Sequence, residues 1–163
     1  MYTHRTKEID LCGTWKFNPD PYQRCRQQKW WQGEGPDDWF FPCFNYEGLW
    51  DIQVPGTWKT QYEELKWYDG HATYVKDFTV DSIPPDSEAF LCFDGIVYQS
   101  EVYLNGQAVG LHEWGYSPFQ LRITELLRKE NRLFVLVDNH LREDRVPGIR
   151  FDWNNDGGII NPV

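Results

Sequence analysis

Short apolar segments bounded by Gly, Pro, Asn or Asp recur along most of this chain. Within several segments apolar and polar residues alternate, as in Leu11–Phe17, where Leu11, Trp15 and Phe17 share one face. Alternation with a period of two is typical of strands that bury one face, whereas the 3.6-residue period of an amphipathic helix is scarce here. The sequence therefore predicts an all-β domain.

The predicted strands are separated by turns. Asn105–Gly106 stands between two of them and is a strong signal for a tight hairpin,. Helix is expected only as a turn near 22–29 and as a short helix at 125–129, with Thr124 as its N-cap. Many short antiparallel strands with little helix favour a jelly-roll β-sandwich. The predicted strands are 11–17, 50–54, 73–80, 89–94, 100–104, 107–111, 119–123 and 132–138.

Charge and hydropathy exclude several classes of partner. The formal net charge is −9, from 16 basic and 25 acidic residues, which argues against nucleic acid and anionic membranes,.

The sequence contains neither an apolar run of roughly 18 residues nor an N-terminal apolar signal region, so it predicts no transmembrane helix and no signal peptide,. Localisation stays open, because a cleaved signal would leave no trace. The length suits one domain.

Aromatic residues make up 17% of the chain and include nine tryptophans, more than a core of this size needs. Most of them are expected in the core, and some are expected to face a ligand or another domain, because aromatic rings stack well on sugars and on protein surfaces. The segment 30–44, rich in such rings, has no predicted role beyond packing between domains.

The four cysteines form no CxxC pair, which excludes a zinc ribbon or a thioredoxin-like motif,. Cys12 and Cys92 lie in apolar strands and are expected as buried free thiols. Cys25 and Cys43 form the one pair that we consider for a disulfide bridge.

Catalytic motifs are absent from the sequence: it has no GxSxG, no HExxH and no Gly-rich phosphate loop,. The four histidines lie far apart and are expected on the surface or in hydrogen bonds. His112 and His140 are the one pair considered for a metal, and we expect neither a metal nor a cofactor. These residues alone favour a binding module over a complete enzyme.

The order of several weak motifs is more specific than any one of them. Over roughly residues 9–163 the chain resembles the N-terminal sugar-binding domain of family 2 glycoside hydrolases, which include β-galactosidases, β-glucuronidases and β-mannosidases. That resemblance implies a galactose-binding-domain-like jelly roll. The motifs are LCGTWKF at 11–17, WDIQVPGTW at 50–58, GHATYVKDF at 70–78, LCFDGI at 91–96, VYLNGQAVGLH at 102–112 and YSPF at 116–119.

The resemblance also implies what the chain lacks. In the family an immunoglobulin-like domain and a (β/α)8 barrel follow, and the barrel alone needs about 250 residues. The catalytic glutamates lie on that barrel, so no residue here is assigned a catalytic role and this chain alone is expected to be inactive. The implied partners are the chain's own downstream catalytic domain, a β-glycoside substrate and further copies of the full-length protein.

One acidic residue of this domain reaches the active site in the family, and the matching position is Asp152, six residues before Gly158. Its carboxylate would accept hydrogen bonds from sugar hydroxyls. Trp153 and Asn155 are candidate neighbours on the substrate, and Asp69 or the adjacent Tyr68 is the candidate for a second contact. Asp152 could instead cap a loop or pair with Arg150.

The specificity is not decided by these residues. Asn155–Asp156 stands where glucuronidase-like members have Asn-Tyr, and Asn154–Asn155 stands where long galactosidases carry Trp and Arg. A β-galactosidase-like activity is our leading interpretation.

Three hypotheses compete. The chain is a fragment of a glycoside hydrolase, a stand-alone carbohydrate-binding module or lectin, or a non-catalytic domain that holds an oligomer together. Gly157–Gly158 followed by Ile159–Ile160 predicts a turn into a new strand, and the sequence ends three residues later,. We therefore favour the first hypothesis.

Overall fold

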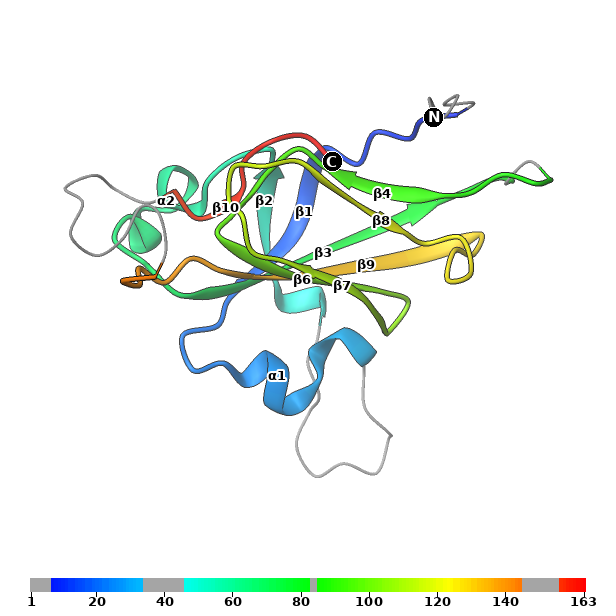
Figure 1. Cartoon of the computed structure of the whole chain (residues 1–163). Helices are drawn as coiled ribbons and strands as arrows, with labels where there is room; N and C mark the ends of the chain where they lie inside the picture. Colours follow the sequence, from blue (N-terminus) through cyan, green and yellow to red (C-terminus); the bar gives the residue numbers. More distant parts are fainter. Residues whose placement is uncertain (1–6, 34–45, 83–84, 145–155) are drawn as a thin grey trace.

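The computed structural model of the chain describes residues 7–33, 46–82, 85–144 and 156–163, and these form a β-sandwich (Figure 1). Within these residues, helix is limited to α1 (Arg24–Gln28), α2 (Trp58–Gln61) and three 3₁₀ turns, η1 (Trp30–Gln32), η2 (Tyr46–Gly48) and η3 (Glu63–Leu65). No helix in the described ranges is long and apolar enough to cross a membrane. The strands are β1 (Gly13–Pro19), β2 (Trp50–Val54), β3 (His71–Thr79), β4 (Phe90–Phe93), β5 (Ile96–Val97), β6 (Gln99–Leu104), β7 (Gln107–His112), β8 (Phe119–Arg122), β9 (Glu130–Asp138) and β10 (Gly158–Ile159).

One sheet carries six strands in the order β2-β1-β3-β9-β6-β7, and its neighbours are all antiparallel. Two short antiparallel pairs, β4–β8 and β5–β10, lie over one face of this sheet (Figure 1). The prediction of an all-β sandwich is confirmed, and so are the eight predicted strands, with their ends shifted by a few residues at most.

The main core fills the space between the sheet and the two short pairs. Trp15 and Phe17 of β1 point into it, as their alternation predicts, and they meet Phe93 of β4 and Ile159 of β10 in one buried cluster. The opposite face of the sheet is covered by α1 and η1 (Figure 1). A smaller cluster fills that side: Cys25, Trp30, Val75, Tyr103, Phe134 and Leu136.

The central strand β9 is apolar on both faces for this reason, and the first five residues of its neighbour β3 are buried. In β9, Leu133, Val135 and Val137 belong to the main core, while Phe134 and Leu136 belong to the smaller cluster. A strand buried on both faces reads as a continuous apolar run rather than as an alternation. The start of β3 lies opposite the end of β9, where His71 pairs with Asp138, and these two ends carry the polar groups described below.

The predicted hairpin is confirmed, because Asn105 and Gly106 connect β6 and β7 with φ angles of 51° and 82°,. The helical turn near 22–29 is confirmed as α1. The helix expected at 125–129 is wrong, since a turn lies there. Thr124 does not cap a helix; its hydroxyl oxygen accepts a hydrogen bond from the Ala89 amide at 2.9 Å, which ties this turn to the residue directly before β4.

The tryptophans divide between the core and the surface. Trp15, Trp30 and Trp58 are buried, whereas Trp67 and Trp114 are 78% and 69% exposed. Some rings therefore face outward, and their contact with a ligand or another domain stays a prediction. Trp39 and Trp153 lie outside the described residues, as do residues 34–45 of the aromatic-rich segment.

The cysteine predictions need correction. Cys25 is a free and fully buried thiol beneath the sheet, which contradicts a bridge to Cys43, a residue outside the described ranges. Burial raises the pKa of the Cys25 thiol, with the nearby Asp20 carboxylate acting in the same direction. Cys12 and Cys92 are free thiols as expected, but they are only half-buried, because they lie where β1 begins and on the outer side of the β4–β8 pair.

Candidate functional site

Polar side chains gather where β3 begins and β9 ends, and we call this place the polar edge. His71 pairs with Asp138 across the two strands, so the residues before His71 and after Asp138 lie side by side. The Asn139 amide donates to the Gly70 carbonyl oxygen at 3.1 Å, and the Gly70 amide donates to Asn139 Oδ1 at 2.9 Å. These two bonds continue the ladder past the strand ends and hold both segments in one register.

Asp69, the candidate for a second substrate contact, lies on the polar edge. Its Oδ1 accepts hydrogen bonds from Lys59 Nζ at 2.7 Å and from Asn139 Nδ2 at 3.4 Å. The Lys59 side chain is only 2% exposed and comes from α2, where the Thr57 hydroxyl caps the first turn. A buried ammonium needs a paired anion, so Asp69 has a structural role here. One third of its side chain nevertheless remains open to solvent.

Asp138 is the centre of the polar edge. Its Oδ1 lies 2.6 Å from His140 Nδ1 and accepts the His140 backbone amide at 2.9 Å. Its Oδ2 accepts a hydrogen bond from Arg142 Nη2 at 3.1 Å and lies 3.9 Å from His71 Nε2. Asp138 is 2% exposed, so this carboxylate depends on these partners for the hydrogen bonds that water would otherwise supply,.

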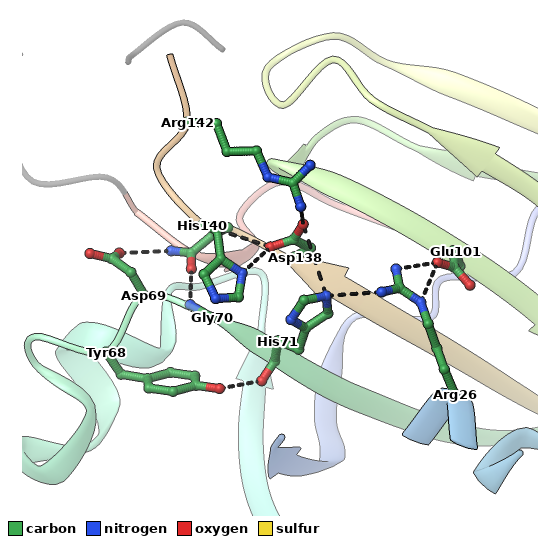
Figure 2. A network of polar contacts seen from close by, with 10 residues as sticks. Arg26, Tyr68, Asp69, Gly70, His71, Glu101, Asp138, His140 and Arg142 are labelled. Atoms are coloured by element: carbon green, nitrogen blue, oxygen red, sulfur yellow. Dashed lines mark hydrogen bonds and ion pairs between the residues drawn. The ribbon is translucent and has the colours of Figure 1, made fainter. Parts of the chain in front are cut away.

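His71 lies beneath Asp138 and is also 2% exposed. Arg26 of α1 donates from Nη1 to His71 Nε2 at 3.1 Å and forms an ion pair with Glu101 of β6 (Figure 2). Burial lowers the pKa of His71, although the Asp138 carboxylate acts in the opposite direction. A guanidinium only donates, so His71 Nε2 carries a lone pair and the ring is neutral.

The other candidate site residues lie outside the described residues: Asp152, Trp153 and Asn155. The chain is described again from Asp156, and Gly157 lies on the polar edge. Its carbonyl oxygen accepts a hydrogen bond from the Trp58 amide at 3.3 Å, and a Cβ at this position would lie 2.4 Å from Asn139 Nδ2. The described chain thus resumes beside Trp58 and Asn139.

His140 does not share a cluster with His112, the residue considered with it for a metal. His140 lies with His71 and Asp138, and the atoms of these three residues that could bind a metal lie within 4.8 Å of one another. His112 lies elsewhere, with its Nε2 2.9 Å from the Trp114 carbonyl oxygen and its ring stacked on Phe119. An antiparallel pairing of 71–79 with 130–138 would have brought His71 and Asp138 together, but the sequence alone does not indicate which strands pair.

A comparison with protein families identifies the chain. Residues 41–148 match the model of the "Glycosyl hydrolase 2 galactose-binding domain-like" family, which is most of the chain. The chain belongs to this family. The galactose-binding-like jelly roll expected from the motif order is therefore confirmed, together with the family 2 glycoside hydrolase context.

Curated relatives carry the names of two related activities. The chain is 34% identical over 106 residues to a β-galactosidase of Thermoanaerobacter pseudethanolicus, covering 63% of this chain and 14% of that protein. It is 29% identical over 150 residues to a β-glucuronidase of Paenibacillus borealis, covering 87% of this chain and 23% of that protein. The chain thus spans less than a quarter of the length of either relative.

Solved structures agree with this assignment. A β-glucuronidase from an uncultured Clostridium species superposes with a TM-score of 0.79 at 29% identity, covering 98% of this chain and 29% of that one. A β-glucuronidase of Ruminococcus gnavus superposes with a TM-score of 0.80 at 21% identity, which shows the shared fold.

Proposed function

We propose that this chain is the sugar-binding domain of a retaining β-glycosidase and that it supplies one substrate-binding carboxylate to an active site completed elsewhere. The observation that carries the proposal is the position of the polar edge. Asp69 and Asn139 lie there, and so does Gly157, which follows Asp152 by five residues in the sequence. The family match supports a sugar as the ligand.

The polar edge suits the task of orienting a sugar. Its buried groups are held by β3 and β9 and by the hydrogen bonds among them, so groups attached to this frame keep their positions,. Asp152 would accept hydrogen bonds from ring hydroxyls, with Trp153 and Asn155 beside it and Asp69 as a second acceptor. A charge-assisted bond of this kind contributes about 1.5–3 kcal/mol.

The catalytic acid/base and nucleophile would come from a downstream barrel, as two glutamates. The small share of each relative that the chain covers supports a longer protein of this kind. This chain alone would then bind sugars weakly, because it forms only part of a pocket. We expect a β-galactoside as the substrate, with a β-glucuronide as the alternative, and a homo-oligomeric full-length enzyme.

The proposal is tested on the full-length gene product with Asp152→Asn. We expect kcat/KM for a nitrophenyl β-galactoside to fall about 10- to 100-fold, because an amide replaces the charged acceptor while the catalytic glutamates remain. The nitrophenyl β-glucuronide is assayed in parallel to decide the substrate. Asp81→Asn, at a carboxylate whose side chain is 92% exposed, is the matched control. An unchanged kcat/KM in Asp152→Asn would show that Asp152 does not bind the substrate.

The native mass of the gene product separates this proposal from a stand-alone carbohydrate-binding module. A mass near the 19.5 kDa of this chain would favour the module, for which the exposed rings of Trp67 and Trp114 offer a surface. Calorimetry of the isolated chain with galactosides, glucuronides and mannosides would then give an affinity in the millimolar range or tighter. A several-fold larger mass with glycosidase activity supports the enzyme.

A further inference from the structure

His71, Asp138 and His140 form a cluster with the donor set of a transition-metal site. Two imidazole nitrogens and one carboxylate oxygen are the ligands of many zinc sites with an open coordination position. The candidate ligand atoms lie within 4.8 Å of one another, and the ligands of a tetrahedral zinc ion lie about 3.3 Å apart,. We propose that this cluster binds a divalent transition-metal ion, and Zn²⁺ is the probe.

His71 and Asp138 are pre-positioned for this role. Both are 2% exposed and sit opposite each other in the ladder between β3 and β9, so their side chains are held by the sheet. His71 Nε2 carries a lone pair, since it accepts from Arg26, and it lies 3.9 Å from Asp138 Oδ2,. A neutral imidazole is the form that a metal requires.

His140 is the ligand that has to move. Its Nδ1 is 2.6 Å from Asp138 Oδ1, closer than two ligands of one metal ion, and its side chain is 41% exposed. The ring centroids of His140 and His71 are 4.9 Å apart (Figure 2), and binding an ion between them requires the His140 ring to rotate away from Asp138 Oδ1. The backbone bond from His140 to Asp138 keeps the ring within reach.

Two guanidinium groups compete with the ion. Arg142 donates to Asp138 Oδ2, but its side chain is half exposed, so it can leave for solvent at little cost,. Arg26 would lose its bond to His71 and keep its ion pair with Glu101, which neutralises its charge. The structure therefore makes a specific prediction: removal of the Arg142 charge should strengthen metal binding.

Isothermal titration of Zn²⁺ into the untagged 163-residue chain tests the proposal. We expect one ion per chain and at least tenfold weaker binding in His140→Ala and in Asp138→Asn. Arg142→Gln should bind about fivefold tighter, because a like charge next to the ion is gone. His112→Ala is the matched control, since His112 lies outside the cluster, and its affinity should equal that of the parent chain.

Co²⁺ provides a second readout, because visible absorption bands report a low-coordinate site with nitrogen ligands, and His140→Ala should abolish them. Circular dichroism confirms that the variants are folded. The proposal fails if the chain binds no stoichiometric ion, or if His140→Ala binds as tightly as the parent chain. It does not rest on the proposed function, because sugar binding and hydrolysis can be absent while the metal binds.

Discussion

The two ends of the central pair β3–β9 carry similar residue types in opposite surroundings. At one end Lys59 pairs with Asp69 and His71 with Asp138, and three of these four residues are at most 5% exposed. At the other end Arg132 pairs with Asp77 through two hydrogen bonds of 2.7 and 2.8 Å, with both side chains open to solvent.

The exposed end surrounds a hollow of about 620 Å³, lined among others by Trp31, Asn105 and Arg132. Its polar groups bond to one another or to the backbone, as Asn105 does to the Leu126 carbonyl oxygen and to the Arg132 amide. Exposed pairs of this kind contribute little and cost little. Buried ones carry a desolvation penalty, which a protein tolerates mostly where the groups have a function. The buried charged groups therefore make the polar edge, and not the exposed end, the candidate functional site.

A substitution at Gly157, at the buried end, is expected to give the largest change in the free energy of unfolding. A Cβ at Gly157 would lie 2.1 Å from Trp58 Cζ2 and 2.4 Å from Asn139 Nδ2, and the Trp58 ring is fully buried. We expect Gly157→Ala to lower the free energy of unfolding by about 3 kcal/mol, as overpacking does in cores. Urea denaturation measures it.

Gly48→Ala is the control for Gly157→Ala, because an added Cβ at Gly48 meets no atom within 4 Å. Its free energy of unfolding should stay close to that of the parent chain. Equal losses in the two variants would mean that the contact between Gly157 and the polar edge does not contribute to stability.

The two ends also differ in how far the sequence predicts them. The strands of both ends follow from apolar patterns, and the Asn105–Gly106 turn follows from its own residues, because these signals are local. The polar edge depends on which strands pair, and that pairing brings together residues far apart in the chain, such as His71 and Asp138. The family resemblance pointed to Asp69 in this region, whereas Arg26 and Asp138 carried no motif at all.

The helix expected at 125–129 shows the same limit on local reasoning. Thr124 and Glu125 have the residue types of a helix start, but the Thr124 hydroxyl bonds to the Ala89 amide, and the Leu126 carbonyl accepts from Asn105. Contacts with distant strands override the local preference. The burial of Cys25 had the same origin, because it depends on α1 lying against the sheet.

Asn139 tests the buried end directly. Its side chain is fully buried, and Oδ1 accepts from the Gly70 amide while Nδ2 donates to Asp69. We expect Asn139→Ala to reduce the free energy of unfolding by about 2 kcal/mol, because a buried backbone donor loses its partner. Chemical denaturation checks this, with the less buried Asn161→Ala as control. A loss below that of the control would contradict a structural role for this amide.

The Asp77–Arg132 pair should give the smallest effect, although its geometry is as good as that of Lys59 and Asp69. The side chains are 62% and 42% exposed, so water and salt screen the attraction,. We expect Asp77→Asn to cost at most about 0.5 kcal/mol, and less at high salt. A double-mutant cycle with Arg132→Gln measures the coupling by denaturation at low and high salt. A coupling energy as large as the loss of unfolding free energy in Asn139→Ala would show that exposure does not weaken the pairs at this end. Burial would then be no argument for a functional site at the polar edge.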